Sequence, residues 1–365
     1  MKSLITHIGT DYPVLLFFAL LLWRIRKSDG DRSSLVAQED GVSLRGMAAI
    51  MVLLHHLAPS TEHGMLMPKV FAMGTGGLAV ALFFFLSGYG LQKQYLKKGE
   101  SYRQSFLKKR IPTILIPFIM FTVLYWLVYF SLGRVITVSY ILSDLRQGIP
   151  FVAYSWYLMA LLFFYLFFWI LMTVFRERVQ WMPFFACGWY LLYAFICIKL
   201  KFLIYWYDTA HLIPVGMFCA VYEQQILKML KNRYFYAALV VTVCFGWLIS
   251  PHVYTAYANE HGMSIQLYYL TSLSRVFFFT ALVVLLHQKI RIGNPVLQYL
   301  GKISLETYLI HGLIFYLLRG DYCDLKNEPL YCFLSLTGVI LIASILYPFD
   351  RFLLRSWKRA TERQR

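Results

Sequence analysis

Long apolar runs separated by short polar links dominate the chain, and runs of nearly 20 apolar residues are long enough to cross a bilayer as helices. From Leu44 onward this pattern predicts ten helices. They cover residues 44–58, 73–92, 111–130, 154–175, 181–198, 203–222, 234–250, 264–286, 299–318 and 330–349. A shorter apolar segment at 4–23 precedes them and is predicted to be one further span, with a helix on the membrane surface as the alternative. The predicted fold class is an all-α polytopic membrane protein with ten core transmembrane helices and an extra N-terminal helix.

Composition supports this class. Of the 365 residues 59% are apolar, against about 45–50% in soluble domains. The formal charge of +17 would suit a nucleic-acid partner, but the cations flank apolar spans and form no separate basic domain. We therefore expect a lipid bilayer and no nucleic acid as partner. The six cysteines show no metal-ligand spacing, and only Cys323 and Cys332 are close enough to suggest a bridge.

The distribution of cations predicts the orientation. One set of alternate links, together with the C-terminal tail, holds 24 Lys and Arg residues, and the other set holds 7. Because cytoplasmic loops carry the excess of positive charge, the first set is predicted to be cytoplasmic. Three regions result: a hydrophobic segment and cytoplasmic link at 1–40, a membrane domain at 41–350, and a basic cytoplasmic tail at 351–365. The predicted location is a cell membrane, of the bacterial plasma-membrane type.

Arg45 and His56 are the first candidates for chemistry. They lie eleven residues apart, so on a helix they share a face and are separated by roughly 16 Å of rise. Arg45 then lies at the cytoplasmic boundary and His56 within the bilayer. An imidazole there can serve as a general base that removes a proton from a hydroxyl, or it can simply bond a neighbouring helix. His55 points about a quarter-turn away, so His56 is the candidate base.

Further polar residues lie in the later predicted spans. Ser304, Tyr308 and His311 form one stripe of a helix, and Arg275 lies midway along its span. Such residues usually face a bundle interior or an aqueous cavity. A structural ion pair between Arg275 and Glu306 is an alternative to a functional role.

Three stretches together resemble the acyltransferase-3 family of integral membrane acyltransferases. They are Arg45 with His56 after ten intervening residues, "GGLAVALFFFLSGYGL" at 76–91, and "ISLETYLIHG" at 303–312. They occur in the order found in that family, and the likeness covers about residues 41–350. Two departures stand out. Ala81 replaces an acidic residue of many members, and Thr113 replaces the second arginine of a loop motif that begins at Arg110.

The resemblance implies transfer of an acyl group, most often acetyl, from cytoplasmic acyl-CoA to a hydroxyl of a cell-surface or lipid-linked glycan. It implies an EC 2.3.1-type O-acetyltransferase that modifies an exopolysaccharide or another polysaccharide of the cell envelope. No tightly bound cofactor and no metal are expected, and acyl-CoA, usually acetyl-CoA, is the co-substrate. The alternatives from other classes are an exporter or flippase of lipid-linked glycan and a structural subunit of a glycan-assembly complex.

The candidate site residues fall into three groups. The catalytic candidates are His56, Arg45 and His311. Donor binding is assigned to Arg45, Lys108, Lys109 and Arg110, although positive-inside topology alone would also place cations there. Acceptor binding is assigned to Ser87, Arg275, Tyr308 and Trp156. Ser87 beside Gly88 could instead permit close helix packing, and Trp156 could be an interfacial aromatic. Direct attack on the thioester and an acyl-histidine relay both remain open.

Overall fold

The computed structural model describes residues 2–28, 33–62, 64–72, 74–262 and 264–363. Residues 29–32 of the predicted cytoplasmic link, residue 73 of the predicted span 73–92 and residues 364–365 of the predicted tail lie outside this described part. Within it the regular secondary structure is helical apart from one two-stranded antiparallel sheet, β1 (Arg26–Lys27) with β2 (Ile290–Arg291), and an isolated bridge between Arg319 and Asp324. The helices are α1 (Lys2–Leu22), α2 (Gln38–Leu57), α3 (Thr75–Lys98), α4 (Glu100–Arg110), α5 (Pro112–Ser131), α6 (Val138–Arg146), α7 (Trp156–Val174), α8 (Met182–Lys199), α9 (Leu212–Val221), α10 (Glu223–Leu230), α11 (Arg233–His261), α12 (Ile265–Lys289), α13 (Pro295–Lys302), α14 (Ser304–Leu318) and α15 (Glu328–Arg363).

Eight segments of the described chain are long and apolar enough to cross a membrane. They are Gln38–Ser60, Thr75–Lys98, Glu100–Ser131, Trp156–Val174, Val179–Lys199, Arg233–His261, Ile265–Lys289 and Glu328–Ala360. Three shorter apolar helices, Thr10–Leu22, Leu212–Val221 and Ser304–Leu318, fall on the remaining predicted segments. The all-α polytopic class is therefore confirmed, although only eight segments have the length to cross by themselves.

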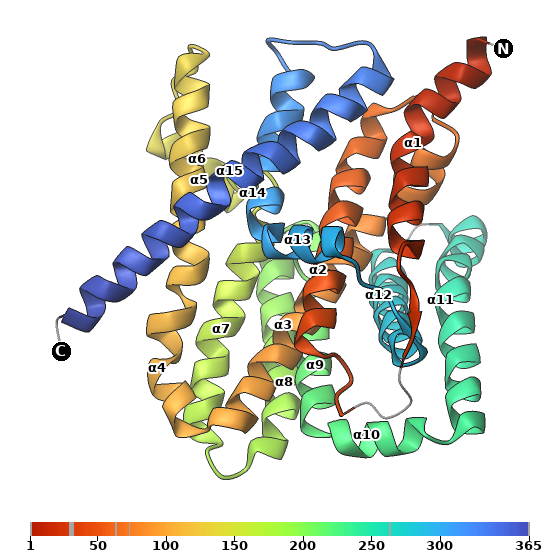
Figure 1. The fold of residues 1–365 in the computed structure, drawn as a ribbon, viewed down its shortest axis with the longest axis vertical. Coiled ribbons are helices and arrows are strands. Elements are labelled where there is room, and N and C mark those ends of the chain that lie inside the picture. The colour runs from red at the N-terminus through yellow and green to blue at the C-terminus, as the bar shows by residue number, and fades with distance from the viewer. Residues whose placement is uncertain (1, 29–32, 63, 73, 263, 364–365) are drawn as a thin grey trace.

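Two predicted spans are shorter than expected, for local reasons. Residues 299–318 are interrupted at Ile303, so that α13 lies across the bundle and α14 begins afresh at Ser304 (Figure 1). Asn294 caps α13 by accepting a hydrogen bond from the Leu297 N–H, and Pro295 follows at the first helical position. In the predicted span 203–222, an aromatic link occupies the first half and α9 only the second.

Glycines set the closest helix contacts. A Cβ on Gly88 of α3 would lie 2.1 Å from the Ile213 carbonyl oxygen of α9, and one on Gly216 would lie 2.3 Å from the Phe85 carbonyl oxygen. Gly46 of α2 and the carbonyl of Leu297 in α13 approach each other in the same way. Small residues let backbones approach closely, which is how membrane helices gain packing energy without a hydrophobic drive between them.

One acidic residue inside the N-terminal apolar segment has a structural role. The buried Asp11 carboxylate accepts hydrogen bonds from the backbone N–H groups of Met65, Leu66 and Met67, at 2.8–3.0 Å. These bonds give the buried carboxylate its hydrogen-bond partners and hold α1 against the loop that follows α2.

The two ends of the bundle differ in charge. Figure 1 shows α4 and α10 at one end, which we call the basic end because the cation-rich links 93–110 and 223–233 lie there. The short helix α6 lies toward the opposite end, which we call the cavity end. The α15 helix continues through most of the predicted tail and ends at Arg363.

Candidate active site

A cavity of about 600 Å³ opens toward the cavity end of the bundle. Its wall is built from α2, the start of α3, the α5–α7 connection including α6, the 204–209 link, α12 and α14. The lining includes four of the predicted site residues, His56, Trp156, Arg275 and Tyr308. Such a volume holds a ligand of about the size of one or two sugar rings.

His56 lies on the cavity wall within a cluster of rings. The Tyr154 ring stacks on it with centroids 3.8 Å apart, the His311 ring follows at 5.2 Å, and the His55 ring lies at 4.9 Å. Tyr154 has a positive φ of 64°, an uncommon conformation for an aromatic residue that often marks a functional site. The sequence pattern gave the histidines but no sign of the strained Tyr154 that positions them.

His55 and His311 each have a fixed hydrogen-bond partner, whereas His56 faces the cavity and makes no hydrogen bond to the described residues. His55 Nδ1 donates to the Phe71 carbonyl oxygen at 2.7 Å, and His311 Nδ1 donates to the Tyr308 carbonyl oxygen at 2.6 Å. In its neutral form His311 therefore carries a free acceptor at Nε2. Because that nitrogen has no proton to donate, His311 could polarise a carbonyl oxygen only in its protonated form. His311 is also fully buried behind Tyr154 and does not line the cavity.

Tyr308 and Trp156 shape the cavity near His56. The Tyr308 hydroxyl donates to the Tyr154 carbonyl oxygen, which holds the strained residue in place. The Trp156 ring lies 5.4 Å from that of Tyr205, and both line the cavity as neighbouring aromatic surfaces. Aromatic faces of this kind can stack on the apolar face of a sugar.

Arg275 is the cavity cation on α12. The sequence left an ion pair with Glu306 as an alternative, and that alternative is wrong. Glu306 is fully buried, and its nearest cation is Arg351 of α15, whose Nη2 lies 3.8 Å from Oε1. The sequence could not separate these cases because which helix faces which depends on the tertiary packing. Cys323 and Cys332, whose spacing would allow a bridge, are both free thiols.

Asp208 is a buried carboxyl at the cavity that sequence reasoning assigned no role. It lies in the link between α8 and α9, and Ser272 of α12 donates a hydrogen bond to Oδ2 at 2.8 Å. Burial raises the pKa of the Asp208 carboxyl to about 6, and the Ser272 hydrogen bond partly opposes this shift. A carboxyl of this kind titrates close to neutral pH.

The predicted donor residues lie toward the basic end and divide into two kinds. Arg45 and Arg110 are partly buried and share Tyr165 as an electrostatic neighbour, and Tyr157 also lies close to Arg45. Lys108 and Lys109 are exposed. Arg45 does not line the cavity, in keeping with the roughly 16 Å of helix between it and His56.

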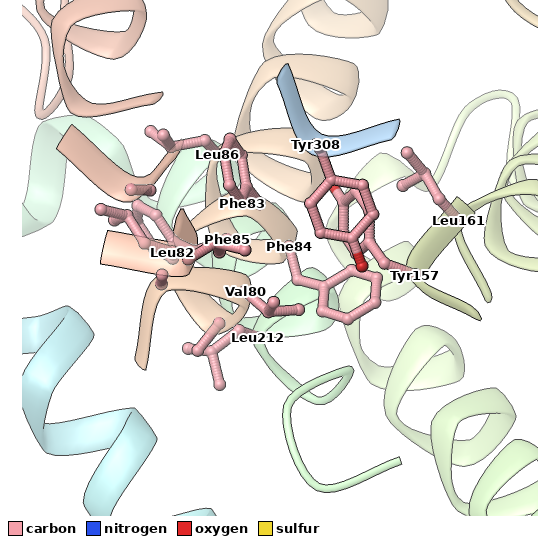
Figure 2. Close-up of a cluster of buried hydrophobic side chains, with 14 of the residues drawn as sticks. Val80, Leu82, Phe83, Phe84, Phe85, Leu86, Tyr157, Leu161, Leu212 and Tyr308 are labelled. Atoms are coloured by element: carbon pink, nitrogen blue, oxygen red, sulfur yellow. The ribbon is translucent and has the colours of Figure 1, made fainter. Parts of the chain in front are cut away.

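Packed aromatic rings separate Arg45 from the cavity. Figure 2 shows Tyr308, Tyr157 and Phe84 side by side, with ring centroids of Tyr157 5.7 Å from Tyr308 and 4.7 Å from Phe84. Ser87 lies close to the hydroxyl of Tyr157, on the far side of these rings from the cavity. The structure therefore does not bring Ser87 into the cavity, whereas Gly88 beside it has the packing role described above.

Comparison with known proteins identifies the class. A family model described as an acyltransferase domain, the acyltransferase-3 type, matches residues 43–348. The chain belongs to this family and is a multi-pass membrane acyltransferase. Membership favours a transferase over the exporter and structural-subunit alternatives. Neither the comparison with curated proteins nor that with solved structures gave a match.

Proposed function

We propose that this acyltransferase moves an acetyl group from cytoplasmic acetyl-CoA to a hydroxyl of a cell-surface or lipid-linked glycan, with His56 as the general base. The observation that carries the proposal is the position of His56. Its ring faces a sugar-sized cavity at one end of the bundle, and Arg45 lies on the same helix toward the cation-rich other end. The proposal also places the protein in a bacterial plasma membrane with its C-terminus in the cytoplasm, because the basic links would face inward.

In the reaction, a ring nitrogen of His56 takes the proton from the acceptor hydroxyl, and the oxygen attacks the thioester carbonyl carbon. The carbon–sulfur bond then breaks, the acyl–oxygen ester remains, and the imidazolium returns the proton to the departing thiolate of CoA. Stacking on Tyr154 fixes the plane of the imidazole, so little orientational freedom has to be lost at the transition state.

Donor binding is proposed at the basic end. Arg45 and Arg110 would bind the phosphates of acetyl-CoA, with the exposed Lys108 and Lys109 adding a weaker attraction. The thin pantetheine arm would follow α2 toward His56. Tyr157 and Phe84 fill this route, so donor binding would have to displace the Tyr157 ring.

The test uses the full-length protein in lipid nanodiscs with acetyl-CoA and decyl glucoside, and it measures both released CoA thiol and acetylated glycoside by mass spectrometry. We expect transfer by the wild type and a loss of at least about 100-fold in His56→Gln, since removal of a general base costs about 10²–10⁴. His55→Gln should keep substantial activity because His55 is engaged with the Phe71 carbonyl. Transfer at the wild-type rate by His56→Gln would refute the assignment, and an acetyl-histidine adduct trapped without acceptor would favour the relay over direct attack.

A further inference from the structure

The guanidinium of Arg275 lies against Gly74, the residue immediately before α3. Gly74 precedes that helix with a positive φ of 77°, and a Cβ at this position would lie 3.0 Å from Arg275 Nη1. The glycine thus has two roles. It adopts a left-handed conformation, and it leaves space for the arginine to reach the cavity beside the start of α3.

The start of α3 adds positive potential at the same place. No side chain caps this 24-residue helix, and Gly74, Gly76 and Gly77 all line the cavity. The backbone N–H groups of the first turn have no intrahelical acceptors, and the helix dipole makes this end positive. A fixed cation beside the positive end of a helix is unfavourable unless an anion joins them.

Two carboxyl residues, Asp144 and Asp208, line the same cavity, but among the described residues neither forms an ion pair with Arg275. Among the described residues no carboxylate lies within ion-pair distance of Arg275. The other cavity arginine differs, because Arg134 pairs with Asp321 and its guanidinium lies over the rings of Tyr129 and Tyr316. Asp208, on the same wall, is bonded to Ser272. Arg275 is therefore an uncompensated cation in a partly enclosed cavity, where charge interactions are stronger than in water.

We propose that Arg275 and the uncapped start of α3 bind an anionic group, carboxylate or phosphate, carried by the acceptor, so that the enzyme acylates an acidic glycan. This proposal rests on the proposed function and names the substrate class for the same cavity. A guanidinium suits both groups because its fork of donors matches their paired oxygens.

The bound anion is distinct from the oxyanion that forms during acyl transfer. The His55 ring packs over Gly76, with Cδ2 2.3 Å from the position of a Cβ there, and so lies between the start of α3 and His56. The acidic group would therefore anchor the acceptor at one place in the cavity while a hydroxyl elsewhere on the glycan reaches His56.

The test compares three acceptors that differ only at carbon 6 of the sugar: decyl glucoside with a neutral hydroxymethyl group, decyl glucuronide with a carboxylate, and decyl glucoside 6-phosphate with a phosphate. We expect the wild type to favour at least one acidic acceptor over the neutral one by about 10- to 100-fold in kcat/KM, the range of one charged hydrogen-bonded contact. Arg275→Gln should remove that preference, so that kcat/KM falls about 10- to 100-fold more with the favoured acidic acceptor than with the neutral one. Arg275→Lys should recover part of it. Whether the glucuronide or the phosphate is favoured distinguishes the carboxylate source from the phosphate source.

The control is Arg146→Gln, which removes an exposed cation from α6 that does not line the cavity. This variant should keep the preference of the wild type. Equal losses on neutral and acidic acceptors in Arg275→Gln, or a raised KM for acetyl-CoA instead, would overturn the anion site.

Binding without turnover separates this proposal from the proposed function. Thermal stabilisation of the wild type by the acidic glycosides, absent in Arg275→Gln and absent with decyl glucoside, supports the anion site even if acetyl-CoA is not the donor. If acetyl transfer occurs but neither acidic glycoside stabilises the wild type or is preferred over decyl glucoside, the anion site is refuted and the proposed function stands.

Discussion

At the scale of single residues, the orientation of His56 depends on Tyr154. The two rings stack at 3.8 Å, and the backbone of Tyr154 is strained and held by Tyr308. A general base contributes its full effect only when it is held in a productive geometry.

We predict that Tyr154→Ala lowers kcat by about 10- to 100-fold, because the imidazole loses the surface that fixes its plane. Tyr154→Phe should stay within about threefold of wild type, since the ring is kept. The measurement is steady-state acetyl transfer at saturating acceptor. A Tyr154→Ala variant with unchanged kcat would mean that stacking does not orient the base.

Asp208 gives a prediction about pH and stability. Its pKa of about 6 in the folded protein lies above the value of about 3.9 for an unfolded chain, so folding favours the protonated carboxyl. The stability that protonation contributes is present below about pH 4 and is lost as the pH rises through 6.

We therefore expect Asp208→Asn to gain stability over the wild type as the pH rises, by on the order of 1–3 kcal/mol between pH 5 and pH 8. The amide keeps the volume and can still accept the Ser272 hydrogen bond. Thermal unfolding of both proteins in the same detergent at the two pH values measures this. A difference that does not change with pH would show that Asp208 is not a buried, ionising group.

At the scale of elements, the α3–α9 contact supports the helix that carries part of the cavity wall. We predict that Gly88→Ala destabilises the protein by about 1–3 kcal/mol, because the added methyl would meet the Ile213 backbone, which cannot move aside as a side chain can.

Gly90 is the matched control for this substitution. It lies on the same helix with nothing within 4 Å of a Cβ position, so Gly90→Ala should be neutral or stabilising by up to about 1 kcal/mol. Thermal denaturation of the two variants in one detergent measures both changes in stability. Equal effects would remove the close contact as the cause.

At the scale of the whole molecule, the proposed donor site lies at the basic end and the proposed acceptor site at the cavity end. The cations at the basic end should therefore differ in how much each contributes to donor binding. We predict that Arg110→Gln raises the KM for acetyl-CoA by about 5- to 20-fold, because Arg110 is partly buried beside Tyr165 and Arg45. Lys108→Gln and Lys109→Gln should each change it by less than about twofold, since exposed charges are screened. If all three variants behave alike, the cations serve topology rather than donor binding.

Sequence patterns predicted the apolar helices and the candidate base, but they missed contacts that depend on how the helices pack together. Within the described residues, hydropathy located the apolar helices, because lipid imposes length and composition on each segment separately. The break at Ile303 and the short α9 depend on packing against other helices, and no local pattern marked them. His56 was found from its helical phase with Arg45. The wrong pairing of Arg275 with Glu306, and the overlooked contact of Arg275 with Gly74, both concern neighbours that only the assembled bundle defines.

The central claim is that a donor from the basic end and an acceptor from the cavity end meet at His56, and its most direct test is a sidedness measurement. Proteoliposomes of uniform orientation would enclose labelled acetyl-CoA at the basic end, with a membrane-impermeant glycan acceptor added outside. The account predicts acetylated acceptor outside with the wild type and none above background with His56→Gln. Labelled acceptor that forms only when both substrates are on the same side, or at an equal rate with His56→Gln, would contradict it.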